Sequence, residues 1–212
     1  MSKFIMRVVA LVSLWCGLTQ YSLATPNDIQ AGQQKSASCA GCHGAQGVAP
    51  SANFPNLAGQ SAKYLAKQLH DFKQAGQGRD DPMMSGFSAP LSATDIAQLA
   101  AYYASLPPSK PSAPIEDDTG KRLYLGGDMA RDIAACSACH GVNGQGLSAA
   151  GFPALAGQHA LYTEQQLTKF KQGQRHNDIN NMMTDISRKL TPAEIAALAA
   201  YIATLAPPNA SN

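Results

Sequence analysis

The sequence predicts an all-α protein built from two copies of one domain, and three observations lead to that prediction. The second half of the chain repeats the first at an offset of 97 to 99 residues. Within each copy, apolar residues recur at helical spacing behind N-terminal capping signals. No segment shows the alternation of polar and apolar residues that indicates a strand. A tandem duplication of one helical unit explains all three.

The repeat is dense enough to align the two halves residue by residue. Cys39, Cys42 and His43 recur 97 residues later, Phe54-Pro55 recurs 98 residues later, and Ala100-Ala101-Tyr102 recurs 99 residues later. A drift of two positions requires only two one-residue insertions. Side chains at equivalent positions are therefore expected to have equivalent roles.

Each copy is expected to contain an N-terminal helix leading into the cysteines, a middle helix and a C-terminal helix. In the first copy these are 27–40, a helix capped by Ser61 that ends at Gly76, and a helix behind the capping box of Ser92 and Asp95. In the second copy they are 119–138, broken at Gly126-Gly127, then 158–172, and a helix behind the box of Thr191 and Glu194.

A proline-rich stretch, 107–114, separates the copies. It holds four prolines in eight residues, which cannot sustain a helix and favour an extended, semi-rigid linker. The predicted organisation is a first domain over 25–106, this linker, and a second domain over 115–212.

Residues 1–24 are predicted to form a secretory signal peptide. Lys3 and Arg7 make a positive n-region, an apolar run extends from Val8 to Leu18, and Ser22-Leu23-Ala24 offers a small-x-small cleavage site. The run is about half of the roughly 20 residues that a membrane span needs. We therefore expect a periplasmic protein with no integral membrane segment after cleavage.

Removal of the signal peptide changes two counts that bear on function. Of the 5 cysteines, Cys16 is lost, and the remaining four (5 − 1) all lie in the two repeated motifs, so no structural disulfide is expected. Lys plus Arg falls from 16 to 14 (16 − 2), equal to the 14 acidic residues. A formally neutral chain without a basic patch argues against nucleic acid as a partner.

The motifs Cys39-Ala40-Gly41-Cys42-His43 and Cys136-Ser137-Ala138-Cys139-His140 have the C-x-x-C-H pattern typical of covalent c-type haem attachment. Two thiols on one helical turn can each add to a vinyl group of one haem, and the adjacent histidine lies under the iron as axial ligand. A pooled zinc site would leave both histidines without a role, and a thioredoxin-like pair would need a βαβ pattern that is absent. The sequence predicts two haem c groups.

The second axial ligand separates an open catalytic iron from a closed electron-transfer iron. Each copy has a methionine pair, and Met84 and Met183 both lie seven residues before the leucine that precedes the last helix. We predict these two as ligands, with Met83 and Met182 as the alternatives. A thioether opposite imidazole raises the reduction potential and closes the iron, which suits an electron carrier.

The remaining histidines, His70, His159 and His176, have no histidine at their repeat positions and are interpreted as surface or supporting residues. A ligating histidine usually donates its other N–H to a carbonyl or carboxylate. We expect the carbonyls of Pro55 and Pro153, which follow the motifs in both copies, to accept this bond from His43 and His140.

On these residues the chain resembles the dihaem cytochrome c4 family, and each half resembles a class I cytochrome c domain. The resemblance rests on the two C-x-x-C-H motifs, on 53–60 and 151–160, and on the two capping-box helices, and it covers 25–206. It implies a periplasmic carrier whose two His/Met haems face each other across the domain interface. The implied partners are a quinol-oxidising complex and a terminal oxidase. The adjacent Met-Met pairs depart from the pattern and leave two candidates at each haem.

Two other functions compete with a free carrier. A dihaem peroxidase would need one haem with a displaceable ligand, and two matched methionines argue against it. A cytochrome subunit of a dehydrogenase or oxidase complex would carry the same motifs. We expect an electron carrier and not an enzyme.

Overall fold

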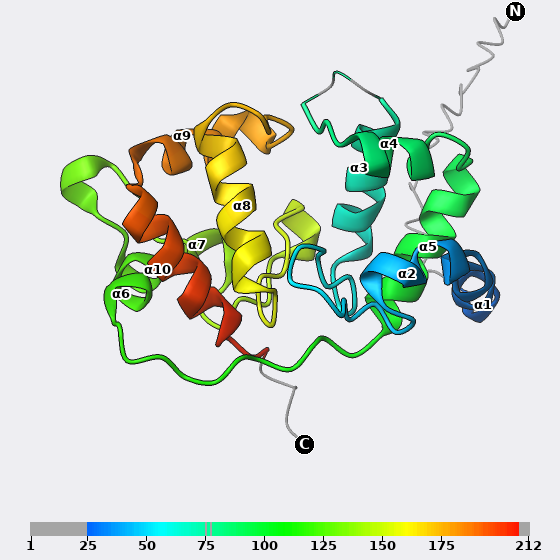
Figure 1. Ribbon diagram of the computed structural model, residues 1–212, viewed down its shortest axis with the longest axis horizontal. Coiled ribbons are helices and arrows are strands. Elements are labelled where there is room, and N and C mark those ends of the chain that lie inside the picture. The colour runs from blue at the N-terminus through cyan, green and yellow to red at the C-terminus, as the bar shows by residue number, and fades with distance from the viewer. Residues whose placement is uncertain (1–24, 75, 77, 208–212) are drawn as a thin grey trace, which may run out of the picture.

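The structure is a computed structural model that describes residues 25–74, 76 and 78–207. The predicted signal peptide, with Cys16, lies outside the described residues. Two groups of helices stand side by side, and an extended segment crosses from one to the other along a single edge (Figure 1). Within the described residues there is no strand, only three isolated β-bridges. The prediction of an all-α protein with two tandem units is confirmed.

The helices follow the same order in both halves. The first half contains α1 (Pro26–Lys35), α2 (Ala40–His43), α3 (Ala62–Lys73), α4 (Pro82–Ser88) and α5 (Ala93–Ser105), with a 3-10 turn η1 (Ser36–Ser38). The second contains α6 (Thr119–Gly126), α7 (Ser137–His140), α8 (Ala160–Lys171), α9 (Met182–Lys189) and α10 (Pro192–Ala203), with 3-10 turns η2 (Met129–Arg131), η3 (Ser148–Ala150) and η4 (Ile179–Asn181).

The capping signals form as predicted. Both boxes are complete: Ser92 accepts from the backbone N–H of Asp95, Thr191 does the same for Glu194, and each acid returns a bond to its cap. Ser61 accepts from the N–H of Tyr64 and begins α3. These bonds satisfy donors that the first turn of a helix leaves free, which is why such short sequences fix the helix starts.

The long helix expected over 119–138 is wrong beyond Gly126. Gly127 has φ +67°, and a Cβ there would lie 2.3 Å from the Ile133 carbonyl oxygen. The chain then folds back, with paired backbone hydrogen bonds between Asp128 and Ile133. The expected 27–40 helix likewise stops at Lys35 and continues as η1 and α2. Left-handed backbone at Gly127 is accessible mainly to glycine and ends a right-handed helix.

In each half the first and last helices cross at a glycine. A Cβ on Gly32 of α1 would lie 2.0 Å from the Gln98 carbonyl oxygen of α5, and one on Gly120 of α6 would lie 2.0 Å from the Ala197 oxygen of α10. The absence of a side chain therefore permits this close approach. Each crossing leads into an apolar core, whose buried members are Leu65, Leu99, Ala100, Tyr102 and Tyr103 in the first half and Leu123, Tyr124, Ile133, Leu167, Leu190, Ile195, Leu198, Ile202 and Leu205 in the second.

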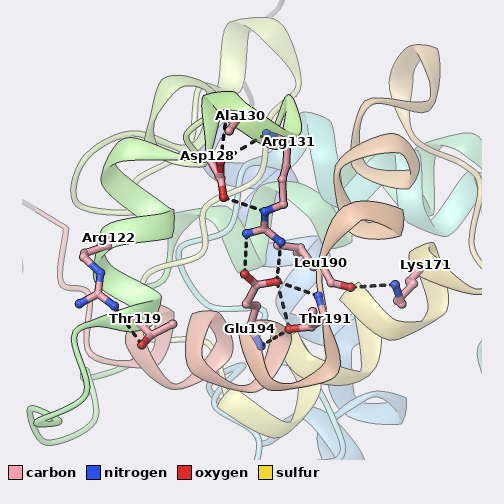
Figure 2. Close-up of polar contacts among 9 residues, drawn as sticks. All are labelled: Thr119, Arg122, Asp128, Ala130, Arg131, Lys171, Leu190, Thr191 and Glu194. Atoms are coloured by element: carbon pink, nitrogen blue, oxygen red, sulfur yellow. Dashed lines mark hydrogen bonds and ion pairs between the residues drawn. The ribbon is translucent and has the colours of Figure 1, made fainter.

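A charged cluster holds the loop after α6 against the start of α10 (Figure 2). The Arg131 guanidinium donates to Glu194 at 2.6 and 3.2 Å and to Asp128 at 2.7 Å. The bond from Arg131, together with the cap at Thr191, lowers the pKa of Glu194 to about 2. The loop that replaces the expected helix is therefore tied by charge to the C-terminal helix.

The proline-rich linker is packed against both halves. Ser109 is 7% exposed, and its hydroxyl donates to the Gly157 carbonyl oxygen. The N–H of Ser112 donates to the Ala203 oxygen at 2.8 Å. Within the described residues, no helix combines the length and the apolarity that a membrane crossing requires.

Candidate haem sites

The one-turn helices α2 and α7 position the motif side chains. The N–H of His43 donates to the Cys39 carbonyl oxygen at 3.0 Å, and the N–H of His140 donates to the Cys136 oxygen at 2.9 Å. This turn brings the two thiols of each motif to one side of the histidine. The four cysteines are half-buried free thiols. Burial raises the pKa of Cys136 to about 11, so this thiol is neutral at pH 7.

The glycines after each motif turn the chain back over the histidine. Gly44 and Gly141 end the one-turn helices at φ +76° and +80°. A few residues on, the carbonyl of Gly47 accepts from two successive N–H groups, and the carbonyl of Gly144 does the same in the second half. The loop that results carries Phe54-Pro55, or Phe152-Pro153, back to the imidazole.

Both histidines donate to the proline carbonyls that the sequence singled out. Nδ1 of His43 lies 2.9 Å from the Pro55 oxygen, and Nδ1 of His140 lies 2.9 Å from the Pro153 oxygen. A carbonyl can only accept, so the proton sits on Nδ1 and the Nε2 lone pair is free to bind a metal. Burial lowers the pKa of both imidazoles, against an opposing contribution from these bonds, and keeps them neutral.

The methionine pairs lie on α4 and α9, two helices that the sequence analysis did not predict. The missed signal is the Asp81-Pro82 pair: the Asp81 carboxylate accepts from the Met84 N–H, and proline occupies the first helical turn. Met84 is half-buried, whereas Met83 is 52% exposed. Met183 packs against the apolar core that Cys136 also contacts.

The other histidines lie away from the motifs. His70 and His176 are exposed. His159 is half-buried, and its Nε2 lies 3.1 Å from the Ala49 carbonyl oxygen in the other half of the chain. These positions agree with their interpretation as surface or supporting residues.

Two buried arginines face each other between the halves, and the sequence analysis missed both. Arg79 donates to the Tyr162 hydroxyl at 3.0 Å and to Gln166 at 3.1 Å. Arg175 donates to the Tyr64 hydroxyl at 2.9 Å and to Gln166 at 3.0 Å. The two arginines are only 96 residues apart in the chain, so the 97-to-99-residue offset does not align them.

Neither guanidinium forms an ion pair with a carboxylate in the part of the chain that the structure describes, although Arg79 is 8% exposed and Arg175 is 6% exposed. A buried cation is costly without a counter-ion. A haem brings carboxylates, so these arginines fit that group. Paired thiols, neutral imidazoles and nearby thioethers complete a donor set suited to haem c.

The fold and this site define a tandem c-type cytochrome, and comparison with known proteins agrees. A family model described as Cytochrome c matches residues 29–107 and again 118–206. Cytochrome c4 of Pseudomonas aeruginosa is 42% identical over 201 residues, covering 92% of this chain and 97% of that protein. The crystal structure of reduced recombinant cytochrome c4 from Pseudomonas stutzeri gives a TM-score of 0.81 at 42% identity, covering 84% of this chain and 98% of that one.

A third relative has a name that states a partner. The thiosulfate dehydrogenase electron acceptor of Thiomonas intermedia is 38% identical over 206 residues, covering 93% of this chain and 90% of that protein. The chain belongs to the cytochrome c4 family. It is a dihaem c-type cytochrome and an electron carrier with two covalently bound haem c groups, and Cys39, Cys42, Cys136 and Cys139 fit the attachment motifs.

Proposed function

We propose that the mature protein is a periplasmic carrier that passes single electrons through two haems, each ligated by one histidine and one methionine. The observation that supports this most is the duplicated histidine setting, in which Nδ1 donates to a proline carbonyl at 2.9 Å in both domains. The proposed domains are 25–106 and 115–212, joined by the linker 107–114 and preceded by a cleaved signal peptide over 1–24.

The residues divide the work at each haem. Cys39 and Cys42, or their twins Cys136 and Cys139, hold the porphyrin through thioether bonds. His43 and His140 offer Nε2 to the iron because Nδ1 carries the proton. When bound, the haem supplies the reversible one-electron couple.

Met84 and Met183 are the proposed second ligands. Met84 is favoured over Met83 because its side chain is half-buried, whereas that of Met83 is 52% exposed. Met183 is chosen for its equivalent position and its packing against the core beside Cys136. A thioether in this position closes the iron to peroxide and favours the reduced state, which disfavours a peroxidase.

Arg79 and Arg175 would hold haem carboxylates at the domain interface. Their buried positive charges have no carboxylate counter-ion among the described residues, and the haem propionates would supply one. This charge compensation would favour the reduced, less positive iron less strongly than bare guanidinium groups would.

The proposed partners are redox proteins. A quinol-oxidising complex as donor and a terminal oxidase as acceptor follow from the cytochrome c4 resemblance. The Thiomonas relative, named as electron acceptor of thiosulfate dehydrogenase, supports a second candidate: delivery of electrons from a dehydrogenase, as a bound or transient subunit. Gel filtration of native extract separates these, since a stable large complex would exclude the free carrier.

Single substitutions test the ligands. Met84→Ala and Met183→Ala should each convert one haem of the two to high spin and lower its reduction potential, because the thioether that stabilises Fe(II) is lost. Met83→Ala and Met182→Ala are the matched controls and should leave both haems low-spin. Optical and electron paramagnetic resonance spectra give the spin states. If the control variants change spin state instead, the neighbouring methionines are the ligands.

A further inference from the structure

The peptide group that accepts each histidine bond is also held by a glutamine from the opposite domain. The carbonyl of Pro55 and the N–H of Asn56 belong to one peptide group. While the carbonyl accepts from His43, the N–H donates to Oε1 of Gln158 at 2.9 Å. The other side of the same glutamine amide, Nε2, donates to the Asn56 carbonyl oxygen at 3.0 Å.

The same arrangement occurs in the reverse direction. The carbonyl of Pro153 accepts from His140, and the N–H of the same peptide group, from Ala154, donates to Oε1 of Gln60 at 2.9 Å. Nε2 of Gln60 donates to the Ala154 carbonyl oxygen at 2.8 Å. Each amide faces one N–H and one C=O, so only one orientation of its oxygen and nitrogen satisfies both bonds. Gln60 and Gln158 occupy equivalent positions in the repeat.

Each histidine is thus the end of a hydrogen-bonded chain that begins in the other domain. A peptide N–H that donates a bond increases the negative charge on its own carbonyl oxygen, because bonds in a chain polarise one another. A stronger carbonyl acceptor draws on the imidazole N–H and makes the ligating nitrogen more basic. A more basic ligand stabilises the oxidised iron and lowers the reduction potential.

We propose that Gln158 and Gln60 are positioning residues that set the reduction potential of the haem in the opposite domain. Gln158, from the C-terminal domain, acts on the haem of His43, and Gln60, from the N-terminal domain, acts on the haem of His140. Docking of the two domains thereby tunes both haems, and separation of the domains raises both potentials. The inference rests on the proposed ligation by His43 and His140.

Gln158→Leu tests this in the full-length dihaem protein. The substitution removes the acceptor of the Asn56 N–H, so the potential of the haem attached at Cys39 and Cys42 should rise. A three- to tenfold change in its equilibrium constant is expected, about 30 to 60 mV for a one-electron couple. The haem of the domain that carries the substitution should change less. NMR-monitored redox titration, with haem methyl signals assigned to each domain, reports the two potentials separately.

The repeat supplies a mirror variant and the interface a control. Gln60→Leu should raise the potential of the haem attached at Cys136 and Cys139 and leave the other in place. Gln165→Leu removes an exposed cross-domain contact, from its Nε2 to Asn53 at 3.4 Å, that has no link to either histidine. It should leave both potentials unchanged.

Two further readouts distinguish the failure of each idea. Amide hydrogen exchange at Asn56 should accelerate in Gln158→Leu and stay slow in Gln165→Leu, whether or not His43 binds iron. If the imidazole signals of His43 and His140 lack paramagnetic shifts in the oxidised wild type, the proposed ligation is wrong. If those shifts are present but Gln158→Leu moves only the haem of its own domain, or neither haem, the cross-domain tuning is refuted.

Discussion

Gly120→Ala is a substitution whose effect on stability depends on the crossing of α6 and α10. In an open helix, replacing glycine by alanine stabilises by about 0.5 to 1 kcal/mol. Here the new Cβ would lie 2.0 Å from the Ala197 carbonyl oxygen and 2.6 Å from its carbon, both backbone atoms. An ordinary contact of about 3.4 Å requires the two helices to separate by more than ~1 Å.

Separation of the helices loosens the core behind the crossing. Tyr124 of α6 and Tyr201 of α10 pack there with ring centroids 5.5 Å apart. Overpacking a fixed core costs about 1 to 3 kcal/mol, and the backbone contact at Gly120 places this site at the upper end. After the propensity gain is subtracted, we expect a net loss of about 2 kcal/mol, or a fall of roughly 10 °C in Tm for a domain of this size.

Thermal unfolding of the dihaem protein, followed by far-ultraviolet circular dichroism, measures the effect. Gly126→Ala is the matched control on the same helix, because no atom lies within 4 Å of its added Cβ and its φ is not positive. It should leave Tm unchanged or raise it slightly. A Gly120→Ala variant as stable as wild type would refute the argument that the crossing requires glycine.

Two further predictions concern charge. The pKa of Glu194 is lowered from 4.5 to about 2, so its stabilisation is present above pH 4.5 and is lost as the pH falls toward 2. Glu194→Gln should therefore lower the urea-unfolding free energy at pH 7 by about 1 to 2 kcal/mol, allowing for solvent screening, with no difference from wild type near pH 2; Asp185→Asn, at a side chain 62% exposed, should change nothing. Arg175→Gln should lower at least one haem potential by about 60 mV, a tenfold change in the one-electron couple, because a buried positive charge is lost. Arg122→Gln, at an exposed site, is its control, and equal shifts in the two variants would contradict a specific role for Arg175.

Features that depend on neighbouring residues were predictable from the sequence. The capping boxes at Ser92 and Thr191 satisfy donors within the same turn, so their three-residue spacing was sufficient. The His43–Pro55 contact spans only 12 positions and the His140–Pro153 contact 13, each within one loop after the motif. The helices α4 and α9 were missed although they are also local, because the Asp81-Pro82 start signal was not used.

The sequence by itself determined the all-α class, the duplication and the two haem attachment motifs, because each is encoded in short spacings or in the repeat. Only the tertiary structure decided where the chain leaves helix after Gly126, since the turn there is stabilised by pairing with Ile133 and by the Arg131–Glu194 contact. The cross-domain bonds of Gln60 and Gln158 join residues 94 and 102 positions apart. Such bonds depend on how two separately folded units dock, and no local propensity specifies that geometry.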